Sequence, residues 1–523
     1  MEKSLIEESA RYNLGKLLRQ LPIATVLPFN AKKAAVFQYK TLFKLLNEAK
    51  DTVYGREHEF AAILASNNIV EGFSEIPIRD YLGMKPYWQK AFEGERDVAW
   101  PEGVSYFALS SGTTDNASKY IPVTQQMLKS IKRAGTRQLM QVARTDFPKD
   151  YLTKDYLFVG GSTDLEFNGN NYSGDLSGIT TSNLPIWMQR FSKPEPYIKS
   201  QKIWADKIDM MVKNAPDWDI AMIAGVPAWI QILFERIINE YKLNTIHDIW
   251  PHLSVYVHGG VSFRPYKKSF DKYLGKPLKY FETYLASEGF IAFQMKENSK
   301  GMRLVFKNGI YYEFIPFNSQ NFDSNGELLS SAKCIGLGQV QENTDYAIII
   351  STCSGAWRYL IGDTVRFTDV NLCEIEITGR TKHFLSLCGE HLSVDNMNEA
   401  VSKTAEDLGI EINEYTVKGI RDGNGFIHNW YLAVNNEIID EALIKQKIDF
   451  YLKASNDDYR VERQHALKDI VIKILPKEVF LTWMDSRGKT GSQNKFPRVM
   501  NDILYQQWLQ FIKDSKHILQ GST

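Results

Sequence analysis

The sequence predicts an α/β protein with a large N-terminal domain, built of β-sheets and packed helices, and a smaller C-terminal α+β domain. The chain has 523 residues, too many for one hydrophobic core, which favours at least two domains. Short β-rich apolar runs alternate with helical patterns along the middle of the chain, as in a sheet covered by helices. The pattern changes near residue 380, which predicts one domain over 1–380 and another over 381–523.

The expected elements of the large domain follow from apolar spacing and punctuating residues. The charged stretch 1–18 reads as an amphipathic helix, and helical spacing continues in 31–50 and 57–68. Pro227 opens a further helix that is expected to run to residue 243. Strands are expected in β-rich apolar runs, several of which end in glycine, at 155–162, 253–260, 303–306, 310–317 and 345–355.

The sequence pattern of the smaller domain differs from that of the large domain. Residues 373–394 predict two short strands around a polar turn, and 395–409 predict a helix. Glycine, arginine and lysine between 379 and 384 suit a hinge, although a plain β-turn suits the same composition.

Composition excludes several classes of function. Lys+Arg and Asp+Glu each total 62, so the net charge is zero, which argues against a protein dedicated to nucleic acid or to an anionic membrane. No apolar run is long enough to cross a bilayer, and the N-terminus lacks the pattern of a signal peptide. The four cysteines form no Cys-x-x-Cys pair. We therefore expect a cytoplasmic protein with free thiols, either a monomer or a weak dimer.

A polar, glycine-bearing stretch at 110–124 has the composition of a phosphate-binding loop. It offers hydroxyls, a glycine and a lysine, at Ser110, Ser111, Gly112, Thr113, Thr114 and Lys119. A helix expected after Thr124 would add positive potential. The stretch is not a P-loop, and the Gly-Lys-Thr at 488–490 lacks the earlier glycine that a P-loop requires. Taken alone, such a stretch is more often a solvated loop.

Three further stretches carry residues suited to nucleotide chemistry. A turn after an expected strand presents Ser287 and Glu288, and Mg²⁺ prefers one or two carboxylates together with phosphates. Asp363 follows a glycine at an expected strand end, where its carboxylate would accept hydrogen bonds from ribose hydroxyls. Four basic residues lie in the loop 487–500. The plainer interpretations are a surface glutamate, a β-turn aspartate and a solvated loop.

Together and in this order, the four stretches resemble the GH3 family of acyl-acid amido synthetases, relatives of the adenylate-forming enzymes. The family's first motif, Ser-Ser-Gly-Thr-Thr/Ser followed by Lys and Pro, resembles 110–122. Its second motif resembles 284–289, and its Tyr-Arg-x-x-x-Gly-Asp motif resembles 357–363 with Trp357 in the first position. Shorter likenesses lie at Gly259, Gly260, Glu313 to Pro316, Gly379, Arg380, Gly389 and Gln493 to Arg498.

Two positions depart from the family pattern. Asn116 stands where the family has a glycine, and Asn tolerates a left-handed backbone. Lys382 stands where the hinge aspartate is usual, which leaves the pivot residue open.

The resemblance implies ATP-dependent adenylation of a carboxylic acid to an acyl-AMP and transfer of the acyl group to an amine, expected to be an amino acid. It implies ATP and Mg²⁺, with Glu288 holding the metal through the ATP phosphates. Lys495 would be catalytic together with Glu288, although Lys489 lies close enough to leave that choice open. The implied ATP- and AMP-binding residues are Ser110, Ser111, Gly112, Thr113, Thr114, Lys119, Gly259, Gly260, Tyr284, Ala286, Ser287, Asp363 and Arg380. The smaller domain would be mobile and rotate between the two half-reactions.

The acyl group is expected to lie in the middle of the large domain, against Trp187, Val226 and Trp229, although apolar residues of this kind are more often core. Two alternatives to the amine acceptor stay open. One is an acyl-CoA ligase or another adenylate-forming enzyme with a thiol acceptor, and the other is a non-catalytic nucleotide-binding relative.

Overall fold

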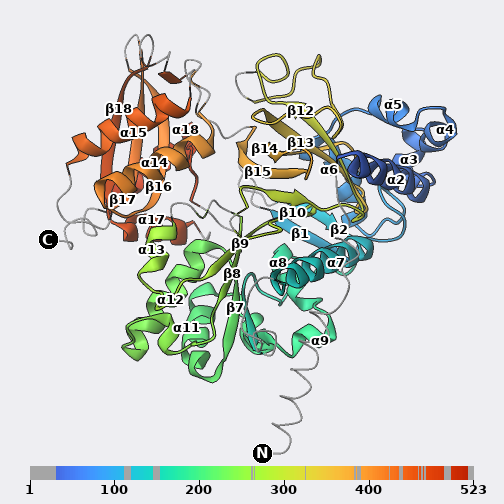
Figure 1. Ribbon diagram of the computed structural model, residues 1–523. Coiled ribbons are helices and arrows are strands. Elements are labelled where there is room, and N and C mark those ends of the chain that lie inside the picture. The colour runs from blue at the N-terminus through green and yellow to red at the C-terminus, as the bar shows by residue number, and fades with distance from the viewer. Residues whose placement is uncertain are drawn as a thin grey trace, which may run out of the picture.

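The fold consists of a large mixed α/β body and a smaller α+β unit beside it (Figure 1). In this computed structural model the described residues are 31–110, 119–144, 154–260, 263, 266–297, 299–323, 326–381, 385, 390, 392–422, 425–434, 440–456, 459–460, 463, 467–487 and 496–515. The helix expected at 1–18 lies outside them. No helix within these ranges combines the length and apolarity needed to span a membrane.

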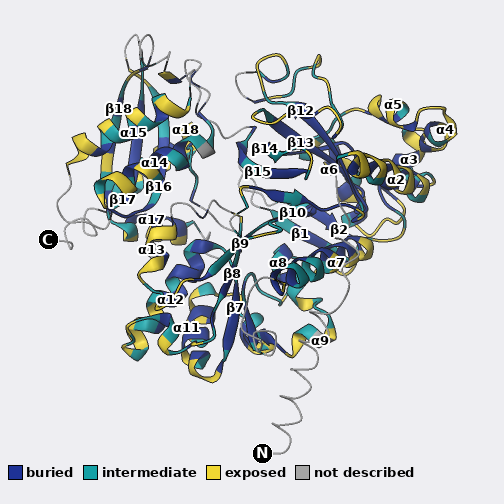
Figure 2. Ribbon diagram, viewed as in Figure 1, coloured by how far each residue is buried: buried dark blue, intermediate teal, exposed yellow. Residues whose placement is uncertain are grey.

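Short helices form the N-terminal part of the described chain, as the sequence predicts. They are α2 (Ala31–Ala49), α3 (Val53–Glu57), α4 (Phe60–Ala65), α5 (Ile69–Ser74) and α6 (Tyr81–Phe92). Apolar residues at helical spacing place one face of α2 in the core and leave the other exposed (Figure 2). Thr52, Asn68 and Asp80 cap α3, α5 and α6 by accepting backbone hydrogen bonds.

One long mixed sheet organises the large body. Its order is β12-β13-β14-β15-β11-β10-β9-β8-β7-β3-β6. At one end of this order, the neighbouring strands β6, β3, β7, β8 and β9 run parallel to one another. From β9 to the other end, at β12, each strand runs antiparallel to its neighbour. The bounds are β3 Asp155–Val159, β6 Ser192–Lys193, β7 Ile220–Gly225, β8 Val255–Gly259, β9 Lys279–Ala286, β10 Gly289–Phe293, β11 Met302–Leu304, β12 Ile310–Pro316, β13 Asp345–Thr352, β14 Tyr359–Asp369 and β15 Glu374–Arg380. The sheet therefore changes from parallel to antiparallel at the β9–β10 hairpin.

A second, four-stranded sheet has the order β2-β1-β5-β4. Its strands are β1 (Tyr106–Ser110), β2 (Lys119–Val123), β4 (Glu166–Phe167) and β5 (Tyr172–Gly174). Helix α7 (Gln125–Val142) follows directly, and Thr124 caps it by accepting a hydrogen bond from the Met127 N–H. The helix expected after Thr124 is therefore present.

The remaining helices of the large body are α8 (Leu176–Ser182), α9 (Ile186–Gln189), α10 (Pro196–Lys199), α11 (Trp204–Asn214), α12 (Pro227–Tyr241) and α13 (Lys267–Asp271), with short 3-10 helices at Ala215–Asp217 and Ile246–Asp248. Of these, α9 to α13 pack against the parallel half of the main sheet, whereas α8 contacts β1 and β5 of the second sheet. Pro227 opens α12 as predicted, because its fixed φ suits the first helical position.

The C-terminal unit has its own sheet, β16-β17-β18. The strands are β16 (Ile412–Asp422), β17 (Gly425–Val434) and β18 (Leu467–Leu475), and the helices are α14 (Val394–Leu408), α15 (Glu441–Ser455), α17 (Lys477–Ser486) and α18 (Asp502–Asp514). The predicted helix at 395–409 corresponds to α14. The predicted second strand near 390 lies partly outside the described residues, and within the described part Leu385 and Leu392 pair in an isolated antiparallel bridge.

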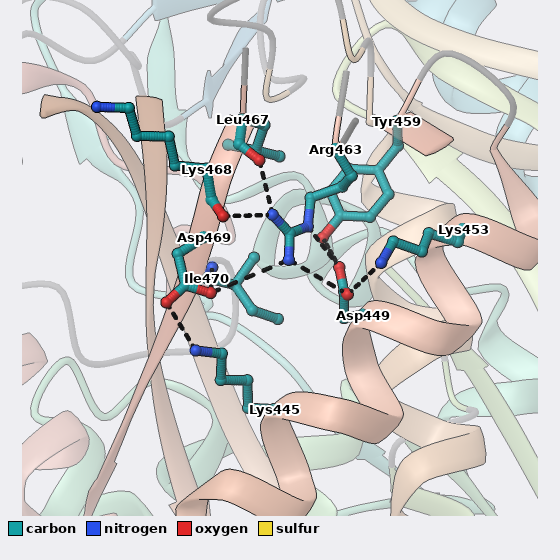
Figure 3. Close-up of polar contacts among 9 residues, drawn as sticks. All are labelled: Lys445, Asp449, Lys453, Tyr459, Arg463, Leu467, Lys468, Asp469 and Ile470. Atoms are coloured by element: carbon teal, nitrogen blue, oxygen red, sulfur yellow. Dashed lines mark hydrogen bonds and ion pairs between the residues drawn. The ribbon is translucent and has the colours of Figure 1, made fainter. Parts of the chain in front are cut away.

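A partly buried arginine, Arg463, joins α15 to β18 (Figure 3). Arg463 donates to Asp449 through Nε and Nη2 at 2.7 and 3.3 Å. Its Nη1 donates to the carbonyls of Leu467 and Lys468 at 2.6 and 2.7 Å. Burial by itself raises the pKa of Asp449, but hydrogen bonds from Arg463 and Lys453 bring it below its usual value. The small unit is thus stabilised by this ion pair and its hydrogen bonds as well as by its apolar core.

Polar contacts join the two parts of the molecule. Lys477 on α17 lies 3.3 Å from Glu235 on α12, and Lys268 on α13 donates to the Ile410 carbonyl at 3.4 Å. Lys272 Nζ also lies 2.5 Å from Glu411 Oε1, and the Glu411 side chain is only 7% exposed. These polar contacts link the two parts in this structure.

Candidate active site

The turn between β9 and β10 presents Ser287 and Glu288, as the sequence predicts. Ala286 pairs with Gly289 across the hairpin, so these two residues form the whole connection. Gly289 has φ +148°, and a Cβ there would meet the Ile310 Cδ1 at 3.0 Å. Glycine is therefore needed at this turn, and Glu288 is held where the sheet changes from parallel to antiparallel.

Asp363 lies at the centre of a hydrogen-bonded cluster. Its Oδ2 accepts from the Tyr284 hydroxyl at 2.5 Å, and its Oδ1 lies 3.0 Å from Arg380 Nε. Asp363 and Arg380 face each other in the register of β14 and β15. Burial, reinforced by Asp363, raises the pKa of Tyr284 well above its usual value, so Tyr284 is a neutral donor. Three residues implied to bind nucleotide are thus brought together.

The sequence-based expectation that Asp363 ends a strand is wrong. Asp363 lies inside β14, which continues to Asp369. Gly362 has φ +91°, and the pairing registers of β14 shift nearby, between Ala347 and Ile349 and between Thr364 and Val365. A glycine inside a strand can mark such an irregularity as well as a strand end.

Glu288 has the most perturbed carboxyl group of the cluster. It is 8% exposed. Burial raises the pKa of Glu288 to about 7, and the negative charge of Asp363 contributes, whereas its own N–H, Arg380 and Lys119 act in the opposite direction. Glu288 therefore lies within electrostatic reach of Asp363, Arg380 and Lys119, and near pH 7 it exists in both protonation states.

This pKa predicts a pH dependence. Below about pH 7 the carboxyl of Glu288 is protonated and cannot hold a cation, and above it the carboxylate forms. We expect kcat/KM for ATP to rise with pH through about 7, because this constant reports ionisations of the free enzyme. Glu288→Gln should lower kcat/KM and remove that inflection. An unchanged inflection in the variant would assign the titration to another group.

The first motif is partly described. Ser110 ends β1 and pairs with Lys119, which begins β2. Lys119 Nζ lies 5.4 Å from the centre of the Tyr81 ring. Ser111, Gly112, Thr113, Thr114 and the departure Asn116 lie outside the described residues. The two strands nevertheless define where the connecting segment begins and ends.

The carboxyl ends of three parallel strands meet beside this cluster. β7 ends just before Val226, β8 ends at Gly259, and β9 ends at Ala286. Gly260 has φ +82°. In open α/β sheets, ligands bind at this edge of the strands. The pair Gly259–Gly260 therefore lies between the cluster expected to bind the nucleotide and the residues expected to contact the acyl group.

Of the expected acyl-contact residues, Val226 and Trp229 lie at the start of α12. Trp229 is mostly buried and packs edge-to-face on Trp204, with ring centres 4.6 Å apart. Trp187 belongs to α9, and its side chain is outside the described part. Trp229 is therefore also a core residue, the plainer role considered from sequence.

Two motif residues, Arg358 and Glu313, form a buried ion pair with each other. Arg358 Nη2 and Nε donate to the two carboxylate oxygens of Glu313 at 3.0 and 3.2 Å, and the side chains are 5% and 7% exposed. Arg358 also donates to the carbonyls of Ser74 and Ile76. This bidentate pair holds β12, β14 and the α5 segment together behind the site.

The lysine-bearing C-terminal loop is described only beside Lys495. Lys489 and Lys495 themselves lie in 488–495, outside the described ranges. Arg498 donates to the Tyr415 carbonyl at 2.9 Å, and its guanidinium lies 4.4 Å from the centre of the Tyr415 ring. The Arg498 carbonyl accepts from the Val417 N–H at 2.9 Å. The chain that follows Lys495 is thus anchored on β16.

The residues present suit a magnesium ion only in company with phosphates. Within the described ranges, no three His, Cys, Asp or Glu side chains lie close enough to hold a metal alone. Glu288 offers one carboxylate, and Mg²⁺ is commonly held by one or two carboxylates together with substrate phosphates and water.

Sequence reasoning missed two tyrosines near the cluster. The Tyr81 hydroxyl accepts from the Tyr120 N–H at 3.1 Å, and its ring lies beneath Lys119. Burial raises the pKa of Tyr359 well above its usual value, and Glu288 and Asp80 add to the shift. Tyr81 begins α6, far from every motif, so no pattern in the sequence could have placed it here.

Comparisons with known proteins cover nearly the whole chain. Residues 29–166 and 162–279 match the GH3 family N-terminal domain, 303–380 the GH3 family central domain and 395–503 the GH3 family C-terminal domain. The jasmonoyl-L-amino acid synthetase JAR4 of Nicotiana attenuata is 20% identical over 95% of both chains. The indole-3-acetic acid-amido synthetase GH3.10 of Arabidopsis thaliana is 21% identical over 85% of this chain and 89% of its own.

Solved structures share the fold. The GH3.15 acyl acid amido synthetase superposes with a TM-score of 0.74 at 16% identity, covering 96% of this chain and 95% of its own. A 2-hydroxyisobutyryl-CoA ligase in the postadenylation state has a TM-score of 0.58 at 14% identity, covering 92% and 94%. The fold is therefore that of adenylate-forming enzymes, as the resemblance implied.

Proposed function

The chain belongs to the GH3 family, and from that premise we propose that it is an ATP-dependent acyl-acid amido synthetase. It activates a carboxylic acid as an acyl-AMP and transfers the acyl group to an amine, for which an amino acid is the preferred acceptor. The observation that carries the proposal is the placement of Glu288 beside the Tyr284–Asp363–Arg380 cluster, at the edge where the parallel strands end.

Adenylation answers a chemical difficulty. A carboxylate does not react usefully with an amine because its leaving group is poor. When the carboxylate attacks the α-phosphate of ATP, pyrophosphate leaves, and AMP then becomes the leaving group for the amine. The enzyme must hold two anions together, and such positioning is a major source of rate acceleration.

The described residues divide this work. Asp363 accepts from Tyr284 and Arg380 and has lone pairs left for the ribose hydroxyls, because a carboxylate accepts about four hydrogen bonds. Lys119 and Arg380 contribute positive charge near the phosphates. Ser110, Ser111, Thr113 and Thr114 would donate hydroxyls to the phosphate oxygens, with Gly112 allowing a close backbone approach.

Glu288 is the proposed ligand for Mg²⁺, which would neutralise phosphate charge when bound. The buried carboxyl has its pKa raised to about 7 in the absence of a cation, and a divalent ion beside it would favour the carboxylate. Ser287 would lie near a phosphate, and Gly259, Gly260 and Ala286 would border the nucleotide.

Lys495 is the proposed catalytic lysine, preferred to Lys489. It would neutralise charge that develops on the α-phosphate and the attacking carboxylate, and preorganised charge of this kind is commonly the largest catalytic term. We place the domain boundary at 380/381, so that the small domain carries Lys495 to the site and rotates away for the second step. The rotation would break the polar contacts that join the two parts in this structure.

The acyl group is proposed to lie near Val226, Trp229 and Trp187, next to Gly259 and Gly260. Val226 follows β7 and neighbours the end of β8, so an acid bound there would lie beside the nucleotide. Small-molecule acids and amines are the proposed partners.

A thiol acceptor is the second candidate, since an adenylate-forming CoA ligase shares the fold. The test supplies ATP, an acid that supports adenylation, and either an amino acid or coenzyme A. We expect an amide by mass spectrometry, with one AMP and one pyrophosphate per amide. Formation of a thioester, with no amide from any amino acid tried, would replace the amido synthetase proposal with the ligase.

A further inference from the structure

A cationic cavity is lined by residues of two helices, α2 and α7. It has a volume of about 490 Å³ and is lined by one stripe of α2, one stripe of α7 and the turn before β12. This volume is within the range of small-molecule sites, about 300 to 1,000 Å³.

Five cationic side chains line the cavity: Lys40, Lys44, Lys129, Arg133 and Lys307. Within the described ranges, the cavity's one acidic lining residue is Glu48, whose Oε1 lies 3.6 Å from Lys44 Nζ. No ion pair joins the other four cations to any described acidic residue. In a chain of zero net charge, the cavity therefore carries a pronounced local excess of positive charge.

Part of the cavity lining is apolar. It is formed by Phe37, Leu45 and Cys353, and Lys307 Nζ lies 4.0 Å from the centre of the Phe37 ring. The Cys353 thiol is buried, and burial raises its pKa to about 12, so it behaves as a neutral apolar surface. A ligand for this cavity therefore combines an apolar body with an anionic group.

The number of cations favours phosphate over carboxylate. A phosphate monoester carries about 1.5 to 2 negative charges near pH 7 and three strong acceptor oxygens, whereas a carboxylate carries one charge. Four unpaired cations around one cavity match the phosphate better.

We propose that this cavity binds a phosphorylated small molecule with an apolar body, at a site separate from the one for ATP. The two sites share α7. Its buried Met127 lies 3.2 Å from where a Cβ on Gly289 would be, next to Glu288, whereas Lys129 and Arg133 face the cavity. Thr124, the N-cap of α7, donates through Oγ1 to the Cys353 carbonyl at 2.6 Å. Occupancy of the cavity is therefore coupled to ATP binding.

The binding test measures the Kd of the probe 1-naphthyl phosphate for the full-length protein by calorimetry. We expect saturable binding that weakens at least tenfold in Lys129→Gln/Arg133→Gln, because two charge-assisted contacts are lost. The matched control, Lys32→Gln/Lys132→Gln, removes two lysines of the same helices that do not line the cavity, and should bind as the wild type does. Lys40→Gln/Lys44→Gln, on the exposed part of α2, should also weaken binding of the probe. This variant replaces the first one if Lys129→Gln/Arg133→Gln folds poorly.

Three results would overturn the site: no saturable binding, equal weakening in Lys129→Gln/Arg133→Gln and in the control Lys32→Gln/Lys132→Gln, or a probe that ATP displaces and that the Lys129→Gln/Arg133→Gln variant binds unchanged. For the coupling, saturating probe should change the Kd of ATP, measured without any acid, at least twofold in the wild type and not in that variant. An unchanged Kd in the wild type would leave no coupling between the two sites.

Discussion

Lys495→Ala should slow acid-dependent ATP–pyrophosphate exchange by about 100- to 1,000-fold, the usual loss when one preorganised electrostatic contact to a transition state is removed. The binding of ATP itself should change little, because the lysine acts on charge that develops during attack. The loss should therefore appear mainly in the rate at saturating ATP, which steady-state exchange kinetics measure directly.

Lys489→Ala is the matched control for this prediction. It removes the same charge from the same basic loop, six positions earlier, and we expect less than a tenfold effect. A large loss for Lys489→Ala with a small one for Lys495→Ala would exchange the two assignments. Equal small losses would mean that neither lysine lies at the reacting phosphate.

Arg358→Met should destabilise the large domain by about 3 to 5 kcal/mol, the range for breaking a buried ion pair. Glu313 would be left buried and unpaired, with 7% of its side chain exposed. The carbonyls of Ser74 and Ile76 would lose a donor as well. The effect should appear as lost protection of β12 and β14 amides in native-state hydrogen exchange, since a chain of this size need not unfold in two states.

Two further variants calibrate that result. Arg366→Met breaks a pair with Asp345 at 2.9 Å whose side chains are 30% and 26% exposed, so it should cost less than about 1 kcal/mol. Arg358→Met combined with Glu313→Leu should recover much of the loss, because no buried charge remains. If the double variant is as unstable as Arg358→Met alone, the unpaired carboxylate is not the cause.

The sequence predicted the local elements well wherever one physical signal dominated. Helical apolar spacing located α2, Pro227 marked the start of α12, and β-rich apolar runs located β8 and β13. Asp363 was misplaced because a glycine inside a strand gives the same local signal as a glycine that ends one.

The candidate site was predicted in parts but not as an arrangement. Spacing and resemblance selected Glu288, Asp363 and Arg380, yet only the pairing of β14 with β15 shows that the aspartate and the arginine face each other. The pKa of Glu288 depends on burial by segments distant in the chain, which no local pattern encodes. The same reason hid Tyr81 beneath Lys119 and the Arg358–Glu313 pair.

Acid-dependent exchange of labelled pyrophosphate into ATP tests the central claim most directly, because only reversible adenylation of the acid produces it. A panel of aromatic and aliphatic carboxylic acids, with Mg²⁺ and no amine, should include at least one acid that supports exchange well above the acid-free rate. Glu288→Gln should lower the rate of that exchange. If no acid supports exchange while ATP still binds, the chain is a nucleotide-binding relative without turnover, and the account of its active site is wrong.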